Sequence, residues 1–456
     1  MTPSLAGRRR SIARNTILNF GGLSLPLLVG VAVMPIITRN MGATRFGLLG
    51  LTLALLEYSG LFDLGLGRAT TKHVAEKLAT GEDEISHLVI GSVLSQVAFG
   101  AVGGILFALA APILANNVFV IPPDMKAEAI AVFRVLGALV PATLLLVSLR
   151  GVLEAAHRFD LSNAVRVPSS LASFLIPAIA SSNGYTLPAI MLMFFTARLF
   201  FCLLSAIAVK RALPQLKLAL PDDWSMLRPL LAFGGWMSVS NVISPLLVYL
   251  DRFMLGAFVG LSAVGYYTAP FDGVVRMLIV PASLVNALFP SVSAMHATGD
   301  REGIKRVFSK AVRNMTVVLA FPALVLVIFG PWLLRLWLGE AFAEAGGTAV
   351  RILAFGVLMN SLAHLPSSFI IAVGRPDVNA KFHMLELLIH IPVAWWLINH
   401  YGVTGAAIAW TIRVTFDAGL LFGGLARLLH TPLIRLVTAK RNVPIPAVTT
   451  LDAVEQ

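Results

Sequence analysis

The sequence predicts an all-α integral membrane protein of about 12 transmembrane helices. They form two six-helix lobes related by a parallel pseudo-two-fold axis along the membrane normal. Three observations carry this prediction. First, 57% of the residues are hydrophobic and only 13% are charged, whereas soluble domains carry about 25% charged residues. Second, the apolar residues form runs of about 20, which match a bilayer core about 30 Å thick. Third, short motifs of the first half recur in order in the second half.

Twelve apolar runs are long enough to cross the membrane. The fifth carries Pro168 and Pro177, which membrane helices tolerate. The expected spans are 16–37, 46–67, 86–111, 129–149, 167–183, 187–209, 231–250, 263–290, 312–330, 350–373, 382–398 and 404–426.

The distribution of lysine and arginine supports this count. With the N-terminus in the cytoplasm, 25 of the 35 lie in cytoplasmic segments, five on the opposite face and five within spans. Basic residues accumulate in cytoplasmic loops, so both termini of this multi-pass protein are expected in the cytoplasm. The net charge of +12 is thereby explained without a nucleic-acid partner.

The two halves repeat at offsets near 215. Each unit holds an even number of spans, so both copies enter the membrane in the same direction, as in transporters with parallel repeats. The matches are Phe20-Gly21-Gly22 with Phe233-Gly234-Gly235, Arg39 with Arg252, Ala79-Thr80-Gly81 with Ala297-Thr298-Gly299, Arg134 with Arg351, Arg158, Asp160 and Asn163 with Arg375, Asp377 and Asn379, and Thr196 and Arg198 with Thr411 and Arg413.

The expected segments are a basic N-tail (1–15), an N-lobe (16–209), a linker (210–230), a C-lobe (231–426) and a C-tail (427–456).

Five arginines within spans are candidates for a substrate site, because a charge in the membrane costs several kcal/mol unless it faces a cavity or a partner. Guanidinium groups suit bidentate contact with phosphate oxygens. A cavity lined by arginines from both halves would hold an anion such as a pyrophosphate; the alternative is inter-helix bridges that hold the halves in register. The candidates are Arg198, Arg413, Arg134, Arg351 and Arg276.

Three acids within spans are candidates for binding a coupling ion, H⁺ or Na⁺: Glu57, Asp272 and Asp417. Asp272 lies four residues before Arg276, and Asp417 four after Arg413. That spacing also permits a salt bridge along one helix face, so a self-neutralised pair is the competing interpretation. For Glu57 the competing interpretation is a hydrogen-bonded helix contact.

The sequence offers no catalytic motif, metal-ligand series or cofactor site. Its one cysteine, Cys202, excludes an internal disulfide framework and multi-cysteine metal sites. The expected extracytoplasmic loops are short, which argues against a membrane enzyme of glycan assembly.

Several loose motifs resemble those of a transporter family. They are Ile37-Thr38-Arg39-Asn40-Met41-Gly42 with Phe46-Gly47, Phe62-Asp63-Leu64-Gly65-Leu66-Gly67, Asp251-Arg252-Phe253-Met254-Leu255-Gly256, Val264-Gly265-Tyr266-Tyr267 and Leu288-Phe289-Pro290. Over about residues 12–426 the chain resembles the Wzx-type oligosaccharide flippases of the multidrug/oligosaccharidyl-lipid/polysaccharide exporter superfamily.

That resemblance implies a V-shaped pair of lobes in the bacterial inner membrane. It also implies a cargo of undecaprenyl-pyrophosphate-linked oligosaccharide, such as an O-antigen repeat unit, moved from the cytoplasmic to the periplasmic leaflet by alternating access. Coupling to an ion gradient and a monomer loosely associated with polysaccharide polymerase machinery are further expectations. The alternative within the superfamily is a multidrug antiporter, whose organic cations an arginine-lined cavity would repel.

Overall fold

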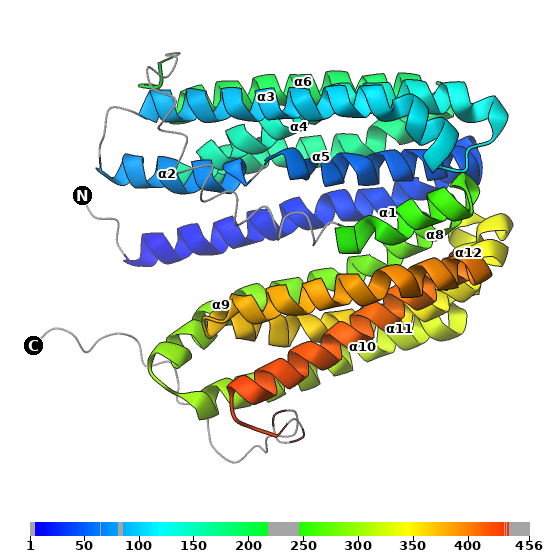
Figure 1. Ribbon diagram of the computed structural model, residues 1–456. Coiled ribbons are helices and arrows are strands. Elements are labelled where there is room, and N and C mark those ends of the chain that lie inside the picture. The colour runs from blue at the N-terminus through cyan, green and yellow to red at the C-terminus, as the bar shows by residue number, and fades with distance from the viewer. Residues whose placement is uncertain are drawn as a thin grey trace, which may run out of the picture.

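The computed structural model describes residues 5–63, 65–80, 85–217, 246–432, 434 and 436, and these residues are almost entirely helical. Figure 1 shows two groups of long helices lying one above the other. The N-lobe comprises α1 (Leu5–Tyr58), η1 (Ser59–Asp63), α2 (Leu66–Thr80), α3 (Ile85–Ile113), η2 (Leu114–Val118), η3 (Pro123–Met125), α4 (Lys126–Ala155), α5 (Phe159–Ser182) and α6 (Leu187–Ala212). The C-lobe comprises a helix over 246–258, α8 (Leu261–Val275), η5 (Arg276–Leu278), α9 (Ile279–Ala297), α10 (Arg301–Leu338), α11 (Glu340–Ala372) and α12 (Pro376–Leu428).

The spans agree with the sequence-based count as far as the described residues reach. Among them, nine helices are long and apolar enough to cross a membrane. Two of these, α1 and α12, each contain a break, at Gly42 and Gly402, where the chain doubles back (Figure 1). Splitting them gives eleven spans. The predicted seventh span (231–250), the linker and most of the C-tail lie largely outside the described residues.

One predicted boundary was wrong. The second span was expected to reach residue 67, but its helix ends at Tyr58, and η1 leads into the separate helix α2. Gly65, with φ 73°, provides the left-handed turn that β-carbon-bearing residues rarely adopt. The residues after Gly65 form α2, a more polar helix that bears basic side chains.

Left-handed turns repeat between the halves. Gly42 (φ 69°) recurs as Gly260 (φ 128°), and Gly184 (φ 74°) as Gly402 (φ 53°), each 218 residues on. These four glycines stand where a span ends and the chain reverses, so the duplicated unit is visible in the backbone. At the same register Arg39 corresponds to Ala257 and Arg198 to Phe416, so the sequence matches of Arg39 with Arg252, at an offset of 213, and of Arg198 with Arg413, at 215, were wrong.

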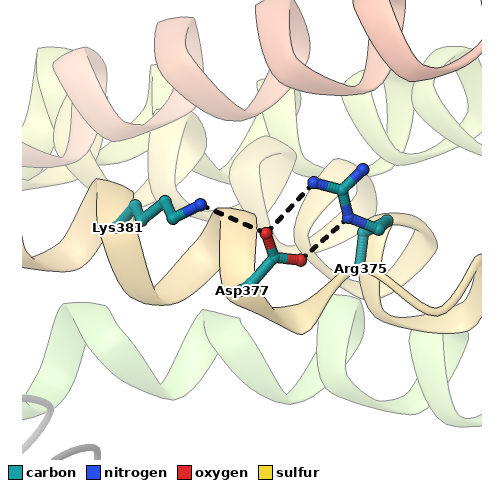
Figure 2. A network of polar contacts seen from close by, with 3 residues as sticks. All are labelled: Arg375, Asp377 and Lys381. Carbon is teal, nitrogen blue, oxygen red and sulfur yellow. Dashed lines mark hydrogen bonds and ion pairs between the residues drawn. The ribbon is translucent and has the colours of Figure 1, made fainter.

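An ion pair also repeats. Arg158 Nη2 lies 2.9 Å from Asp160 at the start of α5, and Arg375 Nε lies 2.9 Å from Asp377 at the start of α12. Figure 2 shows the second pair, which Lys381 joins at 3.4 Å. The offset of 217 therefore relates α5 to the first half of α12.

The hydrophobic cores show how the lobes meet. One buried cluster draws on both lobes and includes Phe133 and Val264. A second cluster, around Val152, belongs to the N-lobe alone, and a third, around Phe308, to the C-lobe alone. We call the end with the shared core the joined end and the opposite end, where α1 starts and α12 ends, the split end (Figure 1). The lobes therefore form a V that is closed at the joined end.

Two glycines form the tightest contact at the joined end. A Cβ on Gly47 of α1 would lie 1.8 Å from the carbonyl oxygen of Leu261 in α8, and one on Gly265 would lie 2.1 Å from the carbonyl oxygen of Ala43. Gly47 with Gly265, and Ala43 with Leu261, are both 218 residues apart. The crossing is therefore symmetric about the pseudo-two-fold axis.

Candidate substrate cavity

A cavity of about 630 Å³ lies between the lobes, within the size range of ligand sites. Apolar and aromatic side chains, including Phe46 and Phe271, form most of its wall. Its charged lining residues are Glu57 and Arg198 from the N-lobe and Arg252, Asp272 and Arg276 from the C-lobe.

Arg252 is held inside this cavity by an acid and two rings. Its Nη2 lies 2.5 Å from Asp272 Oδ1, and its guanidinium lies 5.4 Å from the ring centres of Tyr249 and Phe271. The charge of Arg252 is thus largely compensated. From the sequence, Arg252 was counted among the five basic residues of the extracytoplasmic loops. That placement was wrong, because the helix that includes residue 246 continues to 258.

Arg276 faces the N-lobe. The predicted pair with Asp272 is replaced by the Arg252–Asp272 pair, since the α-helix gives way to the 3₁₀ turn η5 at Arg276. Its guanidinium lies 5.5 Å from the ring centre of Phe174 in α5, and its Nε has no hydrogen-bond partner. Arg276 is therefore a cation available at the lobe interface.

Arg198 projects from α6 and lines both the central cavity and a smaller one inside the N-lobe, as does Glu57. Among the described residues, no ion pair within 4.0 Å engages Arg198. The structure thus brings two of the five predicted arginines, Arg198 and Arg276, to one cavity.

The other three predicted arginines do not line the central cavity. Arg413 is buried in the C-lobe, where its Nη1 lies 3.5 Å from Glu386 Oε2. Its expected pair along the helix with Asp417 is therefore replaced by one between two segments of α12. Arg134 and Arg351 have exposed side chains on α4 and α11.

Sequence reasoning missed a buried polar triad in the C-lobe. Asp251, fully buried, accepts a hydrogen bond from the hydroxyl of Tyr267 at 3.1 Å and lies 3.2 Å from His390 Nε2. Asp251 had been placed just beyond the seventh span, so its burial was not foreseen. Spacing along the sequence could not predict that Asp251 lies beside Tyr267 and His390, because the three residues come from three helices.

Solved structures of two membrane proteins share this fold. An inward-facing multidrug resistance MATE family transporter of the MOP superfamily superposes with a TM-score of 0.74 at 15% identity, covering 90% of this chain and 97% of that one. The lipid II flippase MurJ in an inward closed conformation gives a TM-score of 0.73 at 12% identity, covering 93% and 90%. Both confirm the predicted fold class.

The sequence then identifies the family. Residues 36–347 match the profile described as polysaccharide biosynthesis protein, and the chain belongs to this family. A Shigella flexneri protein named as a candidate O-antigen transporter is 29% identical over 412 residues, which cover 90% of this chain and 97% of that protein. The prediction of a transporter of this type, rather than an enzyme, is confirmed.

Proposed function

We propose that this protein moves a lipid-linked oligosaccharide across the membrane by alternating access. The observation that carries the proposal is the cavity between the lobes. Arg198 from the N-lobe and Arg276 from the C-lobe both line it, and among the described residues neither forms an ion pair with an acid. Guanidinium pairs suit the oxygens of a pyrophosphate linker. The names of the relatives, an O-antigen transporter and a lipid II flippase, support the same class of cargo.

The direction follows from charge and shape together. The split end holds the start of α1, the end of α12 and most of the basic loops among the described residues, so we place it at the cytoplasmic face of the inner membrane. The cavity then receives cargo from the cytoplasmic leaflet and releases it to the periplasmic leaflet once the joined end opens. Each lobe supplies one wall of the cavity, so a monomer suffices.

For coupling to H⁺ or Na⁺, Glu57 is the best placed of the three predicted acids. It lines both cavities, whereas Asp272 is engaged by Arg252 and Asp417 is buried inside the C-lobe. A cation bound at Glu57 would raise the positive charge beside Arg198 and so strengthen the hold on an anionic cargo.

The test is flipping of a fluorescent undecaprenyl-pyrophosphate oligosaccharide in liposomes. Hydrogen bonds to charged groups contribute about 1.5–3 kcal/mol, so Arg198→Gln and Arg276→Gln should each slow flipping roughly 10- to 150-fold. Arg313→Gln, an exposed arginine of α10 outside the cavity, is the matched control and should flip at the wild-type rate. Wild-type flipping by the Arg198/Arg276 double variant would refute the assignment. Extrusion of organic cations instead of flipping would favour the multidrug alternative.

A further inference from the structure

A second cavity, of about 330 Å³, lies inside the N-lobe between α4, α5 and α6. Five serines and one threonine line it, together with Arg150, Arg166 and Arg198. It shares Glu57, Ser173 and Arg198 with the central cavity. One extended ligand could therefore occupy both. We call this cavity the serine pocket.

The serine pocket carries surplus positive charge. Arg150, at its exposed rim, lies 3.5 Å from Glu154, but Nη2 of Arg166 is buried without a hydrogen-bond partner. Glu57 is the one acid among the lining residues, facing three arginines. A buried donor without a partner is costly, and an anionic ligand would supply the acceptor that Nη2 of the half-buried Arg166 lacks.

The C-lobe provides an internal comparison, because it contains the other copy of the unit. In the C-lobe the inward-facing arginine of the second half of α12, Arg413, forms an ion pair with the buried Glu386. At the offset of 217 set by the repeated ion pair, Glu386 corresponds to Ser169, and His390 to Ser173. The position of Glu386 is thus held by a serine in the N-lobe, so the serine pocket has no equivalent of the Glu386 carboxylate. Among the described residues no acid lies within 4.0 Å of Arg198.

The ligand chemistry follows from the lining. Hydroxyl groups donate and accept hydrogen bonds, which suits the hydroxyls of a sugar, while a neutral sugar would leave Arg166 without a counter-charge. We propose that the serine pocket binds an acidic sugar residue of the cargo, one bearing a carboxylate or a phosphate, while the linker occupies Arg198 and Arg276. This inference rests on the proposed function and names the class of glycan it carries.

The test uses the full-length protein in detergent micelles and three probes: glucuronate, glucose and inorganic pyrophosphate. Equilibrium dialysis should show saturable glucuronate binding at least tenfold tighter than glucose. Ser169→Glu places a carboxylate at the position that corresponds to Glu386 in the C-lobe. It should weaken glucuronate binding at least tenfold, whereas the uncharged control Ser169→Gln should weaken it much less. Arg166→Gln should weaken glucuronate at least tenfold more than pyrophosphate, and Arg276→Gln should do the reverse.

Two results would overturn the proposal. Equal affinity for glucuronate and glucose would show that the pocket does not select charge. Equal losses of glucuronate and pyrophosphate in Arg166→Gln would place the linker there instead. Melting temperatures of the variants within a few degrees of wild type exclude misfolding as the cause, and Arg313→Gln again serves as the surface control. Because binding in micelles requires no translocation, failure of flipping would count against the proposed function alone.

Discussion

The glycine crossing at the joined end leads to a quantitative prediction. In Gly47→Ala the new Cβ would stand 1.8 Å from the carbonyl oxygen of Leu261, and real contacts stay beyond 3.0 Å. The helices α1 and α8 must therefore separate by about 1.2 Å. Overpacking of this kind costs about 1–3 kcal/mol, and the cost falls only on the arrangement in which the two helices touch.

The expected consequence is a shift toward the state that is open at the joined end. A difference of about 1–3 kcal/mol changes a two-state ratio by roughly 5- to 150-fold. Spin labels on Glu76→Cys and Glu302→Cys report this ratio, because both residues are exposed at the split end of opposite lobes. The single native cysteine, Cys202, is removed by Cys202→Ala. The pulsed electron resonance distance between the labels should shorten in the population that opens.

Gly419→Ala is the matched control. This substitution also replaces a helical glycine, so it raises helix propensity by about 1 kcal/mol, as Gly47→Ala does. Nothing lies within 4 Å of the new Cβ, however. Its distance distribution should equal that of wild type. An unchanged distribution in Gly47→Ala, or the same change in Gly419→Ala, would refute the assignment of this crossing as the contact that holds the joined end closed.

Two further predictions concern stability, measured by thermal unfolding in detergent. Arg413→Gln leaves the buried Glu386 without its partner at 3.5 Å and should lower the free energy of unfolding by about 3–5 kcal/mol. Adding Glu386→Gln should recover part of this loss. Additive losses in the double variant would contradict the pairing. Trp337→Phe removes the hydrogen bond that Nε1 donates to the carbonyl of Val31 at 2.9 Å, which should cost about 1 kcal/mol. Pro35 lacks the amide hydrogen that would otherwise bond this carbonyl, so Trp337→Phe should cost less in a Pro35→Ala background; an equal cost in both would count against this role.

The fold was largely predictable because its determinants are local in sequence. Long apolar runs mark the spans, and the distribution of basic residues marks their order. Left-handed glycines such as Gly42 and Gly402 mark the reversals, although their pairing became certain only from the backbone angles. The exception, the end of the second span, arose because hydropathy does not register that the α-helix gives way to η1 after Tyr58, within an apolar stretch.

The site was predictable only in part, because ion pairing between helices depends on how each helix is rotated. Spacing of four residues suggested pairs within one helix, yet Asp272 pairs with Arg252 and Arg413 with Glu386. Duplication was an equally incomplete guide, because the match of Arg198 with Arg413 does not survive in the backbone register. Arg198 lines a cavity, whereas Arg413 forms an ion pair inside the C-lobe.

The crossing of Gly47 with Leu261 and of Gly265 with Ala43 has a consequence for the origin of the chain. A contact in which each partner presents the same surface is what a symmetric dimer forms. Two separate copies of the half-length unit would meet through a single glycine used twice, and one substitution would alter both sides at once. In the single chain the two sides are separate positions, so a substitution can change the surface of one lobe at this crossing and leave the other as it is.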